Sequence, residues 1–181
     1  MADQEPAAGS NGSGAGDSET QVSILAQYVK DLSVENPSAP QVFQWQVQPT
    51  LDVQFNINVE KAADEIHEVT LKIEVAARSD NGVHFVVDLS YACLFGLRNV
   101  PEDALPPFLL IEAPRLIFPF ARQIVAEAVT NLGFPPLLLD PIDFGAAYVA
   151  QAQAAEDQPS EAGDGESGGD EGGGEPAPSE A

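Results

Sequence analysis

The sequence has little cysteine and few basic side chains. Cys93 is the single cysteine in 181 residues, so no internal disulfide can form, which fits a reducing compartment. Only 7 Lys and Arg stand against 29 Asp and Glu, which gives a formal charge of −22. This deficit excludes a general nucleic-acid binder, because phosphate contacts need cations. A basic or zinc-bearing protein is a better electrostatic match.

Long apolar runs and familiar chemical motifs are also missing. No stretch approaches the ~20 apolar residues of a membrane helix, so we expect no direct membrane insertion. The first residues carry neither a basic start nor an apolar run, and we therefore expect no secretory signal. There is no glycine-rich phosphate loop and no nucleophile elbow, and His67 and His84 with one cysteine make no metal spacing. We expect no enzyme, no cofactor and no metal.

Composition divides the chain into three parts. Residues 1–20 hold Gly, Ser, Ala and acids, and residues 156–181 hold nine acids with no Lys or Arg. Such segments lack the apolar surface that offsets the entropy of ordering, so we predict two disordered tails. Residues 21–155 are the predicted single folded domain, long enough to bury a core.

Alternating apolar and polar residues predict four strands. Three are regular, at Leu51–Val59, 69–75 and 85–95, and the turn Ser79–Gly82 joins the last two into a hairpin. The first strand, Val22–Glu35, is less regular. One predicted face of this strand, mostly apolar, carries Ile24, Tyr28, Leu32 and Val34. The other, polar face carries Ser23, Gln27, Asp31, Ser33 and Glu35.

Residues four apart predict a long amphipathic helix after the strands. One apolar row holds Phe120, Ile124, Ala128 and Leu132, and the adjacent row holds Ala121, Val125 and Val129. Pro119 fits the first helical position and Gly133 the left-handed cap. Asp143 is the expected N-cap of a second, weaker helix at Phe144–Ala155, and Asp140 a turn former. So broad a stripe needs a partner surface.

Strands followed by helices favour an α+β fold: a four-stranded antiparallel sheet and then two helices, which cover one face and leave the other wet. The links Asn36–Thr50 and Leu97–Ala113 each contain three prolines and are expected to be irregular. The first link carries the aromatic residues Phe43 and Trp45 although it is irregular, and the segments PPFLL and GFPPLLL are also apolar. These side chains either pack in the core or form a deformable groove for other chains.

Four segments resemble the SecB family of protein-export chaperones. They are KDLSVENPSAPQVF, the alternating strand Leu51–Val59, IFPFARQIV and GFPPLLLDPIDFGAAY, in the family's order between about Ile24 and Gln151. The resemblance implies a homotetramer, a dimer of dimers in which two eight-stranded sheets enclose the long helices. It also implies an ATP-independent chaperone that binds unfolded preproteins in the cytoplasm and delivers them to the SecA motor.

The resemblance also implies two sets of site residues. The acids that contact the zinc-bearing tail of SecA match Asp31 and Glu35, and the apolar–acidic pair on the fourth strand matches Val86 and Asp88, where Leu and Glu also occur. The strand parity puts all four outward. The client groove involves the loop after the first strand, which matches Val42, Phe43, Trp45 and Val47. Trp45 stands where some relatives carry a polar residue.

Two other functions remain open. One is a SecB-like chaperone dedicated to a single client, such as an antitoxin, which co-purification with SecA would distinguish. The other is a small-ligand-binding or enzymatic α+β domain, which predicts a closed pocket and a saturable small ligand.

Overall fold

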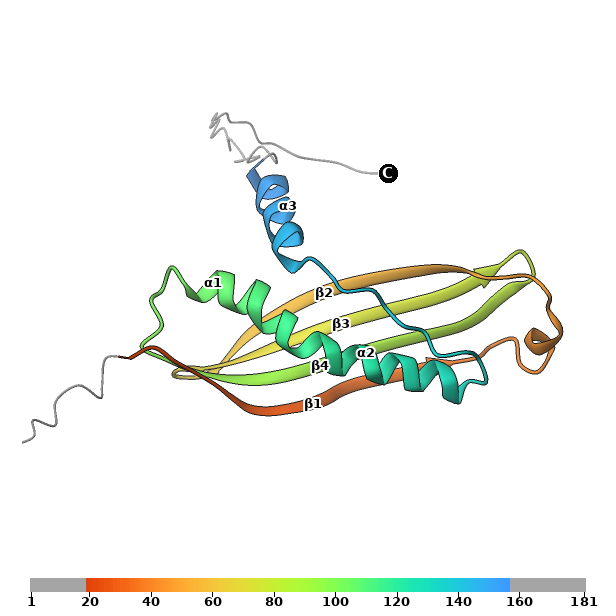
Figure 1. Ribbon diagram of the computed structural model, residues 1–181, viewed down its shortest axis with the longest axis horizontal. Helices are drawn as coiled ribbons and strands as arrows, with labels where there is room; N and C mark the ends of the chain where they lie inside the picture. Colours follow the sequence, from red (N-terminus) through yellow and green to blue (C-terminus); the bar gives the residue numbers. More distant parts are fainter. Residues whose placement is uncertain (1–18, 157–181) are drawn as a thin grey trace, which may run out of the picture.

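The computed structural model describes residues 19–156, and its four strands form one antiparallel sheet in the order β1-β4-β3-β2 (Figure 1). The strands are β1 (Gln21–Glu35), β2 (Thr50–Ala63), β3 (Ile66–Ser79) and β4 (Gly82–Arg98). The predicted α+β class and strand order along the chain are confirmed, with β1 and β2 as the two edges.

The helices follow the strands. They are α1 (Leu105–Pro107), the π-helical turn η2 (Phe108–Glu112), α2 (Ala113–Asn131) and α3 (Phe144–Glu156). In Figure 1, α2 lies across one face of the sheet, whereas α3 extends away from it. A short 3-10 helix, η1 (Gln41–Gln44), interrupts the link between β1 and β2, which was predicted to be irregular throughout.

Two predictions about the helical region were wrong. The link to the long helix is helical from Leu105 onward, and Pro119 lies inside α2 rather than at its start. Pro106 and Pro107 are tolerated because the first turn of a helix leaves its N–H groups unbonded anyway. Pro119 removes the bond to the carbonyl of Arg115, and both residues lie on the exposed side, where water can take that bond.

The predicted faces of β1 were wrong in the middle of the strand. Two β-bulges interrupt its pairing with β4, between Ile24 and Ala26 and between Val29 and Asp31. Residues opposite each other in an antiparallel pair share a face. Tyr28 lies opposite Ala92 and therefore faces outward, and Gln27 lies opposite Cys93 and faces the helix. Each bulge adds a residue and reverses the parity that the alternation predicts.

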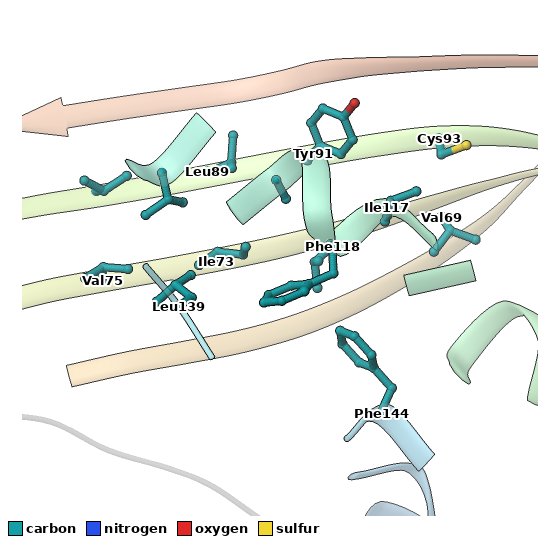
Figure 2. Packing of buried hydrophobic residues seen from close by; sticks show 14 of the residues in the cluster. Val69, Ile73, Val75, Leu89, Tyr91, Cys93, Ile117, Phe118, Leu139 and Phe144 are labelled. Atoms are coloured by element: carbon teal, nitrogen blue, oxygen red, sulfur yellow. The ribbon is translucent and has the colours of Figure 1, made fainter. Parts of the chain in front are cut away.

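The core lies between α2 and the helix side of β3 and β4 (Figure 2). The second predicted row of α2, with Val125 at its centre, is buried against the sheet as expected. Phe118 packs edge-on against Phe144 with ring centroids 6.0 Å apart, which holds the start of α3. Burial of each Val, Leu or Phe side chain stabilises the folded state by about 1.5–3 kcal/mol, so this layer is the main source of the domain's stability. By contrast, Phe120 in the first row is 49% exposed.

The predicted caps at Gly133 and Asp143 and the turn at Ser79–Gly82 are confirmed, whereas Asp140, the expected turn former, lies in a stretch without a turn. Gly133 follows α2 with φ at 89°, and the Asp143 Oδ1 atom accepts a bond of 2.9 Å from the Ala146 N–H. Ser79 pairs with Gly82 in the β3–β4 turn. The predicted tails lie outside the described residues except at their inner ends, where the Thr20 hydroxyl donates to the Asn99 carbonyl at 2.9 Å.

Candidate functional site

The crossover segment, residues 36–49, joins β1 to β2 and is anchored to the end of α2. The Asn36 side-chain amide donates to the Leu132 carbonyl over 3.3 Å. The ring of Phe43 lies 5.7 Å from that of Phe134 and directly above Gly133, where an added Cβ would come within 3.0 Å of it. Gly133 is thus needed for its backbone conformation and for the space beneath Phe43.

A second anchor holds the other half of the crossover segment. Trp45 meets His84 edge-on at 4.9 Å, and its ring lies 3.3 Å from where a Cβ on Gly82 would be. The His84 Nε2 atom hydrogen-bonds the Ser79 hydroxyl at 2.9 Å. His84 and Phe85 are consecutive, yet both rings approach Phe134, at 6.4 and 5.1 Å. A register shift between β3 and β4 at this point allows this departure from strict alternation.

Between these anchors lies an open groove with a volume of about 500 Å³, which we call the crossover groove. It is lined by Val42, Phe43, Trp45, Gln46, Val47, Gln48, Pro49, Leu51, His84, Phe85, Val129, Phe134, Pro135, Pro136 and Leu137. None of these side chains is Asp, Glu, Lys or Arg, so the groove favours apolar segments and disfavours charged ones.

All four residues predicted for client binding line the groove, together with the first part of GFPPLLL. They are not equally accessible: Phe43 is 55% exposed, whereas Val42 is 3% exposed and belongs to the groove floor. The segment PPFLL does not take part, because Phe108 packs on Phe95 in the core at 5.5 Å. Sequence reasoning missed His84, which alternation places on the opposite face.

The outer face of the sheet carries the second candidate site. Strand register arranges it as three parallel rows across β1, β4, β3 and β2. The rows read Asp31–Ser90–Lys72–Asn56, then Ser33–Asp88–Glu74–Gln54, then Glu35–Val86–Ala76–Asp52. We call these twelve positions the acidic grid. It holds five carboxylates and one cation, so it favours a basic partner.

All four residues predicted to bind SecA fall within the acidic grid. Asp31 and Glu35 are separated by ~13 Å along β1, and Asp88 lies one strand away in the row between them. Val86 is the apolar member beside Glu35. Glu74 and Asp52 were not among the residues predicted to bind SecA, although the alternation of β2 and β3, which places both on the outer face, could have added them.

Lys72 is the cation of the acidic grid, and its ammonium forms ion pairs with two of the grid's carboxylates. Its Nζ atom lies 2.9 Å from the Glu74 Oε1 atom and 3.1 Å from the Asp88 Oδ2 atom. The hydrogen bonds that Lys72 donates to Glu74 and Asp88 raise the pKa of Lys72 above its ordinary value. The other oxygen of Asp88, Oδ1, is buried with no hydrogen-bond partner among the described residues.

A polar cluster beside the acidic grid fixes β1 near its bulges. Glu68 accepts hydrogen bonds from the Tyr28 hydroxyl and the Lys30 ammonium, and from the Thr70 hydroxyl at 3.1 Å. The bond from Lys30 holds the pKa of Glu68 below its ordinary value. The bond to Glu68 raises the pKa of Tyr28 to about 12. The cluster therefore ties β1 to β3 across β4 and keeps the Asp31 end of the strand in place.

Other chemistry finds no support within residues 19–156. No group of three His, Cys, Asp or Glu side chains in that range could hold a metal ion. Burial raises the pKa of the Cys93 thiol to about 11, so it is not an activated nucleophile. The helices of the same range are all too short or too polar to cross a membrane.

Comparison with known proteins agrees with these features. The family model described as preprotein translocase subunit SecB matches residues 15–155. The protein-export protein SecB of Sphingopyxis alaskensis is 55% identical over 77% of this chain and 81% of its own length. That of Zymomonas mobilis is 56% identical over 74% of this chain and 81% of its own.

A solved structure has the same fold. The Mycobacterium tuberculosis SecB-like chaperone, in complex with a ChAD peptide from the HigA1 antitoxin, matches with a TM-score of 0.56 at 18% identity, over 67% of this chain and 90% of its own. With the family model and the relatives above, the chain belongs to the SecB family of protein-export chaperones.

Proposed function

We propose that this chaperone holds unfolded preproteins in the crossover groove without ATP and delivers them to SecA through the acidic grid. The observation that supports client binding is the groove itself, an open recess of about 500 Å³ whose lining contains no Asp, Glu, Lys or Arg. An unfolded chain exposes the apolar and aromatic side chains that such a lining accepts, whereas a folded protein buries them.

Low sequence selectivity follows from the same lining. Apolar contacts are non-directional, and the half-exposed Phe43 ring on the crossover segment can adjust to different side chains. Gln46 and Gln48 supply hydrogen-bonding groups at the rim for the main chain of a client. We therefore expect many clients that share exposed apolar segments rather than a motif.

Delivery to SecA is supported by the charge of the acidic grid. The acidic grid lies on the face of the sheet opposite α2 (Figure 1), so a basic, zinc-bearing tail can reach it while the groove is occupied. Exposed acids speed the encounter with a basic partner and add moderate affinity.

We also propose the homotetramer, a dimer of dimers in the cytoplasm, with no enzymatic activity. Within one chain α2 leaves Leu116 and Phe120 exposed, at 46% and 49%, and β1 has a free edge with exposed apolar residues. A second and third copy can cover these surfaces. Val125 does not contribute to these contacts between copies, because it is fully buried within its own chain.

A holding assay tests the proposal. The wild-type chain should suppress aggregation of a reduced, denaturant-unfolded globular protein without ATP, and should not bind the same protein when it is folded. Because Trp45 is the single tryptophan, its fluorescence should change as the unfolded protein is added. Equal binding of folded and unfolded protein, or an unchanged Trp45 signal at saturation, would contradict the proposal.

The alternative is a chaperone dedicated to an antitoxin, and the Mycobacterium tuberculosis SecB-like chaperone was solved with a peptide from an antitoxin. Pull-down of purified SecA by the wild-type chain distinguishes the two, because a dedicated chaperone has no need of the export motor.

A further inference from the structure

Lys72 is the one cation at the twelve positions of the acidic grid. Five carboxylates share that surface, from Asp31, Glu35, Asp52, Glu74 and Asp88. A face that evolved only for attraction of a basic partner has no use for a positive charge in the middle. Lys72 therefore needs an explanation of its own.

The contacts of Lys72 place it in direct competition with an incoming cation. Its ammonium lies 3.1 Å from the Asp88 Oδ2 atom and 2.9 Å from the Glu74 Oε1 atom. The side chains are partly exposed, 40% for Lys72 and 32% for Asp88, so a partner can reach them. A lysine or arginine that binds Asp88 must either displace the Lys72 ammonium or lie beside it, and like charges at that distance repel.

A tethered cation has an advantage over a free one. Lys72 is already held on β3 by the backbone, so its ion pair costs no translational freedom, whereas a partner loses that freedom on binding. One arriving positive charge therefore gains little from Asp88. Several positive charges on one partner can engage Asp31, Glu35 and Asp88 together and offset the displacement of Lys72.

We propose that Lys72 is a specificity-determining residue of the acidic grid: an internal counter-ion that weakens single-cation ligands and reserves the face for a partner with clustered positive charges. The inference rests on the proposed docking function of this face. It explains why the face does not bind every basic peptide, and it identifies Lys72 as the residue that sets how many positive charges a ligand needs.

The test compares Lys72→Met with Lys61→Met. Lys61 is a matched control, because it also forms an ion pair, with Asp64 at 3.1 Å, but lies near the end of β2, outside the acidic grid. Both changes make the chain more acidic by one charge. The ligands are purified SecA, a peptide with one lysine and a peptide with four adjacent lysines, titrated at low salt.

Lys72→Met should bind SecA and the four-lysine peptide about two- to five-fold more tightly than Lys61→Met does, the effect of one exposed ion pair. The relative gain should be larger for the one-lysine peptide, so selectivity for clustered charge should fall. Lys72→Arg should restore wild-type affinity and selectivity. All variants should keep the wild-type circular-dichroism melt.

Three outcomes would overturn the proposal. Equal gains in Lys72→Met and Lys61→Met would mean that only net charge matters. Weaker binding by Lys72→Met would mean that Lys72 supports Asp88 for the partner instead of competing with it. If neither wild type nor Lys72→Met binds the peptides, the counter-ion role fails. A wild type that binds the four-lysine peptide but not SecA overturns only the proposed delivery to SecA, and the peptide comparison still decides the role of Lys72.

Discussion

The crossover groove and the acidic grid lie on the same domain but rely on different interactions, apolar contact in the groove and exposed charge on the grid. The groove is concave, rich in aromatic side chains and lined without Asp, Glu, Lys or Arg, whereas the grid is a sheet face that carries five carboxylates. Apolar contact is non-directional and resists salt, while exposed charge acts at longer range and is screened by salt. The difference teaches that holding a client and recognising the motor can be tuned independently, because no residue of one site belongs to the other.

The largest expected effect comes from reversing charge in the acidic grid. Asp31→Lys combined with Asp88→Lys should weaken SecA binding by at least about 100-fold, because like-charge contacts cost several kcal/mol. Calorimetric titration at low salt checks this. The same variant should hold unfolded clients as wild type does, and unchanged SecA affinity would remove the grid from the docking surface.

A smaller effect should appear on the other side of the comparison. Phe43→Ser combined with Trp45→Ser should weaken client binding about 10-fold, since two aromatic contact surfaces are lost. Light scattering during client aggregation checks this, with SecA binding and native mass as the unchanged controls. If the double variant holds clients normally, the crossover segment only covers the core.

Salt should separate the two sites without any mutation. Raising the ionic strength from ~0.05 to ~0.5 M shortens the screening length from ~14 to ~4 Å, so SecA binding should fall by about an order of magnitude. Client binding should stay constant or tighten. A parallel loss of both would mean that charge also holds the client, which a lining without Asp, Glu, Lys or Arg argues against.

The smallest effect concerns the cluster around Glu68. Glu68→Gln should lower the free energy of unfolding by about 1 kcal/mol at neutral pH, because charged hydrogen bonds from Tyr28 and Lys30 are lost. Since the folded state lowers the pKa of Glu68, its contribution is present above the ordinary value of 4.5 and is lost as pH falls further.

At high pH the same cluster acts through Tyr28, whose folded-state pKa of about 12 exceeds its ordinary value of 10.0. That contribution is present below pH 10 and is lost as pH rises towards 12. Denaturant melts across both pH windows check this, with Thr70→Val as the mild control. A variant Glu68→Gln with the wild-type pH profile would contradict it.

The sequence predicted the fold well where one local rule acts alone. Strict alternation located β2, β3 and β4, and cap chemistry located Gly133 and Asp143. It failed where two rules compete: Pro119 signals a helix start locally, yet packing of the preceding turns continues the helix through it. His84 could not be assigned to the groove, because a register shift between two strands is a property of the pair and not of either segment.

The two bulges of β1 also determine where the strand can change length. Each extra residue reverses the faces, so the pair restores the parity between the Ile24 end and the Leu32 end of the strand. Leu25 has no partner on β4, because Ile24 pairs with Phe95 and Ala26 pairs with the next residue, Leu94. Deletion of Leu25 would therefore remove the first bulge and leave every other residue of β1 opposite the same partner and on the same face. Length variation in relatives should accordingly fall at the bulges of β1 rather than at its paired positions.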